Sequence, residues 1–193
     1  MAKSLEDMSL EELWQLFPIF LKEHNKDWAA WYKEESRRIQ SFLPANQLYE
    51  MHHIGSTSIE GIWAKPIIDI LLEIPRSEDM GSIKRELLEH GYLLMSESEG
   101  RMSFNKGYTL QGFSERVFHL HLRYYGDNDE LYFRDYLKVH PDVAKDYEQL
   151  KLTLWKKYEY NRDAYTEAKT DFIRQHTQKA KKHYKRKYDD KIE

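Results

Sequence analysis

The chain has 193 residues, of which 40% are hydrophobic and 14% aromatic, enough to build a folded core and to exclude a disordered chain. It contains no cysteine, which excludes a disulfide framework, a thiolate nucleophile and a cysteine-ligated zinc site. The net charge of −3 argues against a dedicated nucleic-acid binder. Because no apolar run resembles a signal peptide or reaches the roughly 18 residues of a membrane span, a cytoplasmic protein without a membrane partner is expected.

Residues 1–45 are predicted to be helical. Ser9 begins a capping-box pattern, and apolar residues at helical spacing follow over 10–21. Pro18 lies inside this run, which predicts a kink or a restart of the helix there. A second amphipathic stretch over 26–43 completes the N-terminal helices.

Residues 46–125 have the pattern of a sheet. The run IIDILLEI is almost continuously apolar, which is typical of a central strand buried on both faces. Strands mixed with helix in this way predict an α/β (α+β) fold. The predicted strands are 48–54, 67–74, 92–95, 101–108 and 117–124, with a helix over 80–90 that ends at Gly91.

Residues 126–185 return to helical spacing, and 1–193 is therefore predicted to be one domain, a mixed sheet flanked by N-terminal and C-terminal helices. The expected helices are 131–138, 141–160 and 164–184, with Pro141 in the first turn of the second. Residues 186–193 form a charged, basic tail. Residues 174–193 hold eight Lys and Arg against three Asp and Glu, interpreted as a solvated helix end, with contact to an acidic partner or nucleic acid as the alternative.

The segment HHIGSTSIEGIWAKPIIDILLE carries the most chemistry. Gly55 lets the backbone approach a ligand closely, and the hydroxyls of Ser56, Thr57 and Ser58 beside free amides are suited to phosphate oxygens. Asp69 lies inside an apolar strand, where burying a carboxylate costs free energy. A Mg²⁺ ion that bridges this carboxylate to substrate phosphates would offset that cost.

A Gly-Ser turn followed by an acidic strand resembles the signature of the nucleotidyltransferase superfamily. More specifically, HIGSTS, AKPIIDIL, FHLHLR, LYFRDYLKVHP and AYTEAKTDFI resemble the GrpB family, over about residues 10–173. The resemblance implies a nucleotidyltransferase-like fold, a nucleoside triphosphate held by the turn, and a divalent metal held by Asp69 as the catalytic carboxylate. Mg²⁺ or Mn²⁺ is expected, with Zn²⁺ or Fe²⁺ as alternatives.

The chain departs from the superfamily pattern at one position. Active members carry two acids separated by one residue, and Leu71 stands where the second is expected. Strand alternation puts Asp69, Leu71 and Glu73 on one face. Glu73 lies about 6–7 Å farther along the strand and is expected to be a solvated strand-end residue.

Two histidines offer a compensation for the missing acid. His119 and His121 share one face of a predicted strand, and with Asp69 they would form a 2-His-1-carboxylate metal site, which favours Fe, Mn or Zn. Hydrogen bonding to cleft groups without a metal is the alternative. Arg123, on the same face, and Lys65 are predicted to contact a phosphate, with a carboxylate partner for Arg123 and a surface position for Lys65 as alternatives.

Six further residues are weaker candidates, for which packing or ion pairing is the alternative. Strand alternation lets at most one of two adjacent histidines face the site. Tyr165 and Lys169 lie four apart on one helical face and are candidates to line the cleft. The six are His52, His53, Arg134, Asp135, Tyr165 and Lys169.

Three functions remain open from the sequence. The first is metal-dependent transfer of a nucleoside monophosphate from a nucleoside triphosphate to an acceptor that the sequence does not identify. The second is a catalytically weak relative that binds a nucleotide or another phosphorylated small molecule as an interaction module, which the missing second acid favours. The third is hydrolysis at an Asp/His metal centre.

Overall fold

A computed structural model describes residues 4–45, 49–185, 187 and 188. Its centre is a five-stranded mixed sheet in the order β1-β2-β5-β4-β3, in which β2 and β5 run parallel and the other pairs antiparallel. This confirms the predicted mixed α/β fold. The strands are β1 (Glu50–Ile54), β2 (Ile67–Ile74), β3 (Leu93–Ser98), β4 (Arg101–Thr109) and β5 (Gly112–Tyr124).

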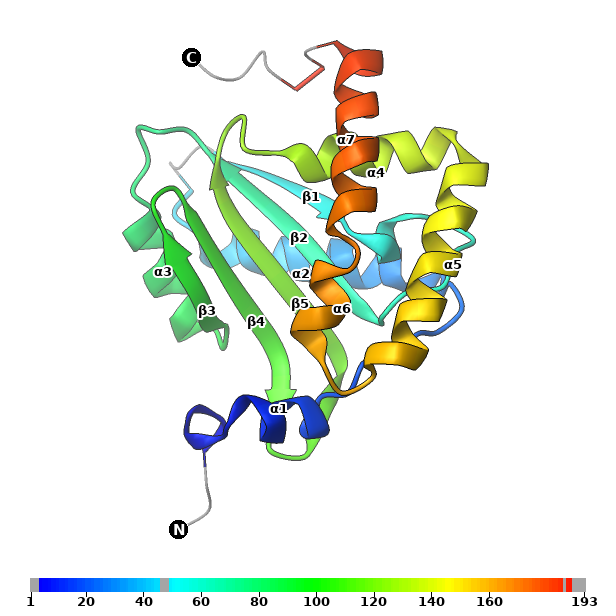
Figure 1. Cartoon of the computed structure of the whole chain (residues 1–193). Helices are drawn as coiled ribbons and strands as arrows, with labels where there is room; N and C mark the ends of the chain where they lie inside the picture. Colours follow the sequence, from blue (N-terminus) through cyan, green and yellow to red (C-terminus); the bar gives the residue numbers. More distant parts are fainter. Residues whose placement is uncertain (1–3, 46–48, 186, 189–193) are drawn as a thin grey trace.

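Helices cover both faces of the sheet, as Figure 1 shows. One face carries α2 and α3, and the other carries α4 to α7. The helices are α1 (Leu10–Leu16), α2 (Asp27–Phe42), α3 (Met80–Glu89), α4 (Asp129–Val139), α5 (Pro141–Tyr158), α6 (Arg162–Glu167) and α7 (Thr170–Tyr184), with short 3-10 turns η1 (Leu5–Asp7) and η2 (Ser56–Ser58).

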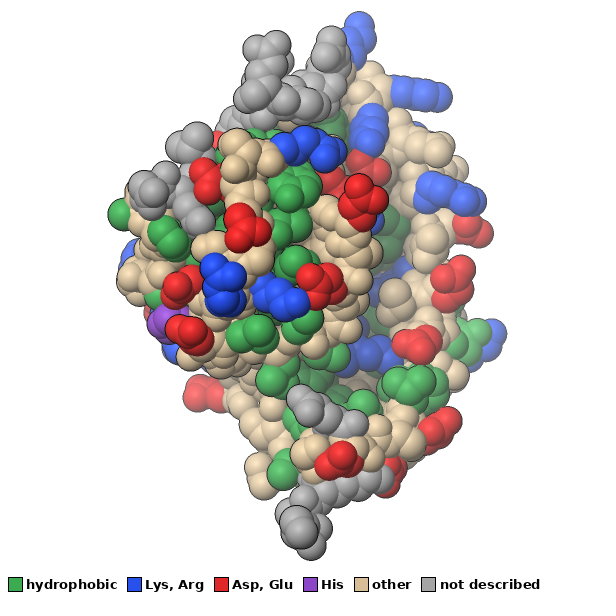
Figure 2. Space-filling view, turned by 90° about the vertical axis from the view of Figure 1, so that its left-hand side faces the viewer, with side chains coloured by type: hydrophobic (Ala, Val, Ile, Leu, Met, Phe, Trp, Pro, Cys, Tyr) green, Lys and Arg blue, Asp and Glu red, His purple; other side chains and the backbone are tan. Residues whose placement is uncertain are grey.

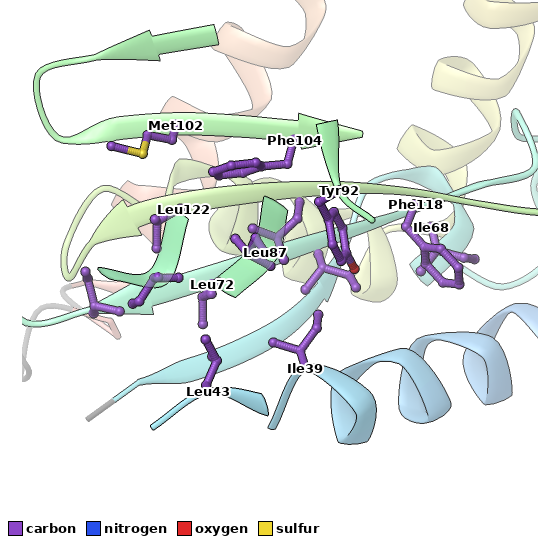
Figure 3. Close-up of a cluster of buried hydrophobic side chains, with 14 of the residues drawn as sticks. Ile39, Leu43, Ile68, Leu72, Leu87, Tyr92, Met102, Phe104, Phe118 and Leu122 are labelled. Atoms are coloured by element: carbon purple, nitrogen blue, oxygen red, sulfur yellow. The ribbon is translucent and has the colours of Figure 1, made fainter. Parts of the chain in front are cut away.

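The main core lies between the sheet and α2 and α3 (Figure 3). Alternate residues of β2, such as Ile68 and Leu72, are fully buried there, and Phe104 of β4 packs beside them. Ile39 of α2 and Leu87 of α3 close the core from outside the sheet. Burying each such side chain stabilises the fold by about 1.5–3 kcal/mol, and this holds the sheet in place.

The N-terminal region differs from the helix predicted over 10–21, which was expected to kink or restart at Pro18. The capping box at Ser9 is present, but α1 ends at Leu16, before Pro18, and none of its residues is buried. The following segment is tied to distant parts of the chain instead: Ile19 N donates to Glu159 O at 2.8 Å. A proline has no backbone N–H to donate the helical hydrogen bond, so helix α1 ends before Pro18. The chain then continues in an extended form alongside the sheet.

The predicted helix over 164–184 is two helices in the structure. The break lies at Ala168 and Lys169, where Lys169 N donates to Thr166 O, a three-residue spacing that tightens the turn. The helical part of the basic segment is a solvated helix end, as interpreted from the sequence, with Lys179 and Lys182 of α7 exposed. Beyond this helix the chain contacts α4, where Lys187 Nζ lies 2.6 Å from Asp135 Oδ2 and Tyr188 packs against a buried cluster that includes Leu131. Residues 186 and 189–193 of the tail lie outside the described residues.

The edge strand β3 is protected by charge. Its residues are mostly exposed, including Leu93 and Met95, and Lys84 of α3 pairs with Glu97 at 2.5 Å. Figure 2 shows Lys, Arg, Asp and Glu side chains interspersed with hydrophobic ones over the side of the molecule that carries this edge. Charges at an edge disfavour pairing with another chain. Among the described residues, no helix combines the length and apolar character that a membrane crossing needs.

Helix α5 holds the loop that leads into β2. Glu148 is 4% exposed, and its Oε2 accepts a hydrogen bond from Trp63 N at 2.6 Å. We expect Glu148→Ala to lower the free energy of unfolding by about 1–3 kcal/mol, because it leaves a backbone donor without its partner. Urea denaturation checks this, with the exposed Asp146→Ala on the same helix as control. Equal stability of the two variants would contradict it.

Candidate functional site

The parallel pairing of β2 and β5 brings the predicted strand residues together. Asp69 lies opposite His119 in the register. His119 Nδ1 is 3.4 Å from Asp69 Oδ1, and His121 Nε2 is 3.7 Å from the same oxygen. The predicted adjacency of the two strands is therefore present.

The Gly-Ser turn lies directly against this carboxylate. Gly55 has φ 70° and ψ −177°, and a Cβ built on it would lie 2.2 Å from Asp69 Oδ2. Only glycine adopts this backbone readily, so the turn requires it. Within the turn, Ser58 Oγ donates to Gly55 O at 2.6 Å and Thr57 Oγ1 donates to Ile67 O at 3.2 Å. These two hydroxyls stabilise the turn.

A cavity of about 270 Å³ lies beside the turn, bounded by β2, β5, α5, α6 and the start of α7. Of the predicted site residues, Gly55, Ser56, Thr57, Lys65, Asp69 and His119 line it, whereas Ser58 and His121 do not. That it binds a ligand stays a prediction. The predicted contact of Lys65 with a phosphate stays a prediction. Three basic side chains that the sequence analysis did not assign to a phosphate also line the cavity: Lys151, Arg162 and Lys169.

The cavity is strongly basic, since four cationic side chains face one carboxylate. In the described part of the chain, no carboxylate forms an ion pair with Lys65, Arg162 or Lys169. Burial and the nearby Arg162 and Lys169 hold the pKa of Lys65 well below its usual range. Burial lowers the pKa of Lys151 to about 7, with a contribution from Lys169. Burial and mutual repulsion therefore disfavour the charged forms of these two lysines.

The pKa values of Lys169 and Asp69 are also shifted in the cavity. Burial lowers the pKa of Lys169 to about 8, although Asp69 opposes the shift. Burial alone would raise the pKa of Asp69, but hydrogen bonds from His119 and His121 hold it far below the usual range. Asp69 is therefore an anion at any pH near neutral.

A chain of hydrogen bonds connects α6 to Asp69. The Arg162 guanidinium donates to the Tyr108 hydroxyl at 2.6 Å, and that oxygen lies 2.8 Å from His119 Nε2. Because the ionised Asp69 can only accept, Nδ1 carries the imidazole proton. Burial lowers the pKa of His119, so the neutral ring accepts from the Tyr108 hydroxyl at Nε2. Both nitrogens of His119 are thereby used within the protein, as in the alternative considered for the cleft histidines.

This arrangement is not a preformed metal centre of three protein ligands. Among the described residues, no group of three or more His, Asp or Glu side chains is disposed to hold a metal ion. The nitrogens of His119 and His121 that lie nearest Asp69 point at one carboxylate oxygen. A metal at Asp69, His119 and His121 stays a prediction.

Arg123 and Glu73 lie away from the cavity. Arg123 is 7% exposed and lies near two carboxylates, with Nε 3.5 Å from Asp127 and a terminal nitrogen 3.6 Å from Glu130. Arg123 therefore has the carboxylate neighbours predicted as the alternative to a phosphate, and the structure does not bring it to the candidate ligand site. The expectation of a solvated Glu73 is wrong: it is 3% exposed and accepts from Asn128 Nδ2 at 3.0 Å.

Of the six weaker candidates, two line the cavity and four lie outside it. Tyr165 and Lys169 line the cavity, with Lys169 Nζ 4.3 Å from the centre of the Tyr165 ring. His53 packs under the turn, stacked on Tyr32, and burial lowers its pKa to about 4. The other three lie outside the cavity: His52 is near Glu50 and Glu73, and Arg134 pairs with Asp135 at 2.8 Å.

The sheet, with its glycine turn and strand carboxylate, has a nucleotidyltransferase-like fold. In agreement, the solved structure of the GLD-2/RNP-8 complex matches 96% of this chain and 74% of that chain, with a TM-score of 0.51 and 11% identity. At that identity the likeness concerns the fold alone.

The chain belongs to the GrpB family, since the sequence model of the family described as "GrpB protein" matches residues 18–179. Glutamate-rich protein GrpB of Alkalihalophilus pseudofirmus is 34% identical over 80% of this chain and 91% of its own length. UPF0157 protein YqkA of Bacillus subtilis is 33% identical over 82% of this chain, which spans only 46% of that relative. The crystal structure of conserved protein GrpB from Enterococcus faecalis matches 86% of this chain and 99% of that chain, with a TM-score of 0.74 and 30% identity.

Proposed function

We propose that the basic cavity binds the phosphate groups of a nucleoside triphosphate, or of another phosphorylated small molecule. The observation that carries the proposal is the excess of four basic side chains over one carboxylate in a cavity beside a glycine turn. A polyanion would remove the mutual repulsion of Lys65, Lys151, Arg162 and Lys169, and it would favour their charged forms. Charge-assisted hydrogen bonds to phosphate are stronger than those to neutral acceptors.

A divalent metal fits this ligand better than it fits the protein alone. Asp69 is an ionised carboxylate, and phosphate oxygens would supply the further hard ligands that Mg²⁺ or Mn²⁺ prefers. When bound, the metal would neutralise charge on the phosphates. A Zn²⁺ or Fe²⁺ centre at Asp69 would instead require His119 Nδ1, which faces Asp69, to lose its proton and bind the metal.

Nucleotidyl transfer is the reaction that we propose for such a complex. An acceptor oxygen attacks the α-phosphorus in line, the bond from that phosphorus to its bridging oxygen breaks, and pyrophosphate leaves with the electron pair. The acceptor's proton passes to solvent or to a base. In this scheme the protein contributes positioning and charge stabilisation: the cations hold the phosphates, and Asp69 stays ionised at the turn.

Binding without turnover is the second candidate, and one observation favours it. Leu71, which replaces the usual second acid, is fully buried in a cluster with Ile54 and Leu131. Glu73, on the same face, is hydrogen-bonded to Asn128. Asp69 is then the sole carboxylate among the described residues that line the cavity. Two-metal catalysis needs ions about 3.5–4 Å apart, which one carboxylate supports poorly.

Calorimetric titration with ATP, GTP, CTP and UTP, each with Mg²⁺ or Mn²⁺, tests the binding proposal. We expect Lys169→Met to weaken binding at least about tenfold, because it removes a cation from the cavity. Lys156→Met, at an exposed lysine of α5, serves as the matched control and is expected to bind as the wild type does. Binding that Lys169→Met leaves unchanged, or the absence of any binding, would contradict the proposal.

Pyrophosphate release separates the two candidates. Transfer predicts pyrophosphate in the presence of a metal and an acceptor, and Asp69→Asn is expected to abolish it. Binding without release, in a screen of hydroxyl and phosphate acceptors, favours the second candidate.

A further inference from the structure

A second cavity of about 390 Å³ adjoins the basic one. Its walls come from the segment between α1 and α2, from the face of α2, and from the beginning of β5. Aromatic rings supply much of the lining: Phe20, Trp28, Trp31 and Phe113. Neither the phosphates nor the metal of the proposed function would use this space.

The two cavities have two lining residues in common. Lys65 and Ile67 line both of them. On the basic side, Lys65 Nζ lies 5.2 Å from the centre of the Tyr165 ring. Ile67 is two residues before Asp69 on the same strand face. A ligand with a charged end and a ring at the other would therefore meet cations on one side of Lys65 and aromatic rings on the other.

The aromatic wall also connects to the hydrogen-bond chain that ends at Asp69. Phe20 and Phe113 have ring centres 5.9 Å apart, and Phe113 lies 5.2 Å from Tyr108. Tyr108 in turn bonds to His119. One of the rings that would receive an aromatic group, Phe113, thus packs against the tyrosine that bonds to His119.

We infer that the aromatic cavity binds the nucleobase of a nucleotide whose phosphates lie in the basic cavity. This inference rests on the proposed function and makes it specific: the ligand is a nucleotide, and neither an inorganic polyphosphate nor a sugar phosphate. Bases stack on aromatic side chains through their π-faces. Polar groups that line the cavity would form hydrogen bonds with the edge of the base. Asn25 is one of them: its Oδ1 accepts from Asp27 N at 2.9 Å, and its amide nitrogen remains a donor.

The experiment compares the dissociation constant of ATP with that of methyl triphosphate, which carries the same phosphates but no base or ribose, both with Mg²⁺. The proteins are the wild type, Phe20→Leu and Phe113→Leu. Leucine keeps the apolar character of the wall and removes the ring. Phe42→Leu on α2 is the control, since Phe42 stacks on His90 and lines neither cavity. Thermal unfolding verifies that each variant is folded.

We expect the wild type to bind ATP at least about tenfold more tightly than methyl triphosphate, the magnitude typical of base–aromatic stacking. The two cavity variants should lose this advantage and keep their affinity for methyl triphosphate. Equal affinity of the wild type for both ligands, or unchanged ATP binding in both variants, would overturn the inference alone. Failure of the wild type to bind either triphosphate would overturn the proposed function, and this inference with it.

Discussion

Replacing Gly55 with alanine is expected to lower the free energy of unfolding by about 3–5 kcal/mol. Its backbone conformation, φ 70° and ψ −177°, alone costs a side-chain-bearing residue roughly 1–3 kcal/mol. The new Cβ would also lie 2.2 Å from Asp69 Oδ2 and 2.9 Å from its Cγ. Asp69 is held by His119 and His121, so the collision displaces the candidate site's carboxylate. Urea denaturation measures the loss, and titration with ATP and Mg²⁺ measures the accompanying loss of binding.

Gly61→Ala is the matched control for this prediction. Gly61 also has a positive φ, 75°, but a Cβ built there meets no heavy atom within 4 Å. We expect it to cost only about 1–2 kcal/mol, the backbone term alone. Equal losses in the two variants would show that the contact between Gly55 and Asp69 relaxes without cost, and that the turn is not built around the carboxylate.

The sequence predicted the centre of the fold accurately because burial left a clear pattern there. The bounds of β2 match the apolar run IIDILLEI at both ends. A strand buried on both faces is almost all apolar, so its length can be read directly. The hypothesis of a site formed by Asp69, His119 and His121 implied that β2 and β5 are neighbours. The parallel direction of the pair was not predicted, since no local pattern specifies how distant strands pair.

The basic cavity was only partly predictable. Tyr108 and Arg162 meet across 54 residues of sequence, and nothing near either one indicates the other. The position of Lys151 in the sequence, in contrast, does point to the cavity. It lies four residues after the buried Tyr147 on the apolar face of α5 and is 2% exposed. A lysine on the buried stripe of an amphipathic helix indicates a site or a partner.

Glu73 and Arg123 show where strand alternation is insufficient. It put both side chains on the correct face of the sheet, but position along the strand decides their surroundings. Both lie near the carboxyl ends of parallel strands, close to the start of α4. There Asn128 satisfies Glu73, and Asp127 and Glu130 lie beside Arg123. Asn128 reaches Glu73 across 55 residues of sequence, so this contact exists only in the tertiary fold, whereas Asp127 lies four residues after Arg123.

The lysines of the basic cavity make the ligand-free protein sensitive to pH. Lys151 and Lys169 have pKa values of about 7 and about 8 in the folded state, whereas unfolded lysine has a pKa of about 10.4. Between these values the unfolded chain binds more protons than the folded one, so the free energy of unfolding rises with pH. At pH 7 and below, most of the free-energy cost of keeping these buried lysines protonated in the folded protein is present. We expect a rise of about 3 kcal/mol between pH 7 and pH 9, measured by urea denaturation.

Two comparisons test whether the slope of the free energy of unfolding against pH comes from the cavity lysines. Lys151→Met removes one of the titrating groups, so it should stabilise the ligand-free protein at pH 7 and reduce the slope, whereas Lys156→Met should leave both unchanged. A phosphate ligand acts in the opposite sense on the same groups, because its charge raises their pKa values in the folded state. ATP binding at pH 8 should therefore take up protons, and titrations in buffers of different ionisation enthalpy count them. Binding without proton uptake at pH 8, or a slope that Lys151→Met does not reduce, would place the ligand or the titration outside the cavity.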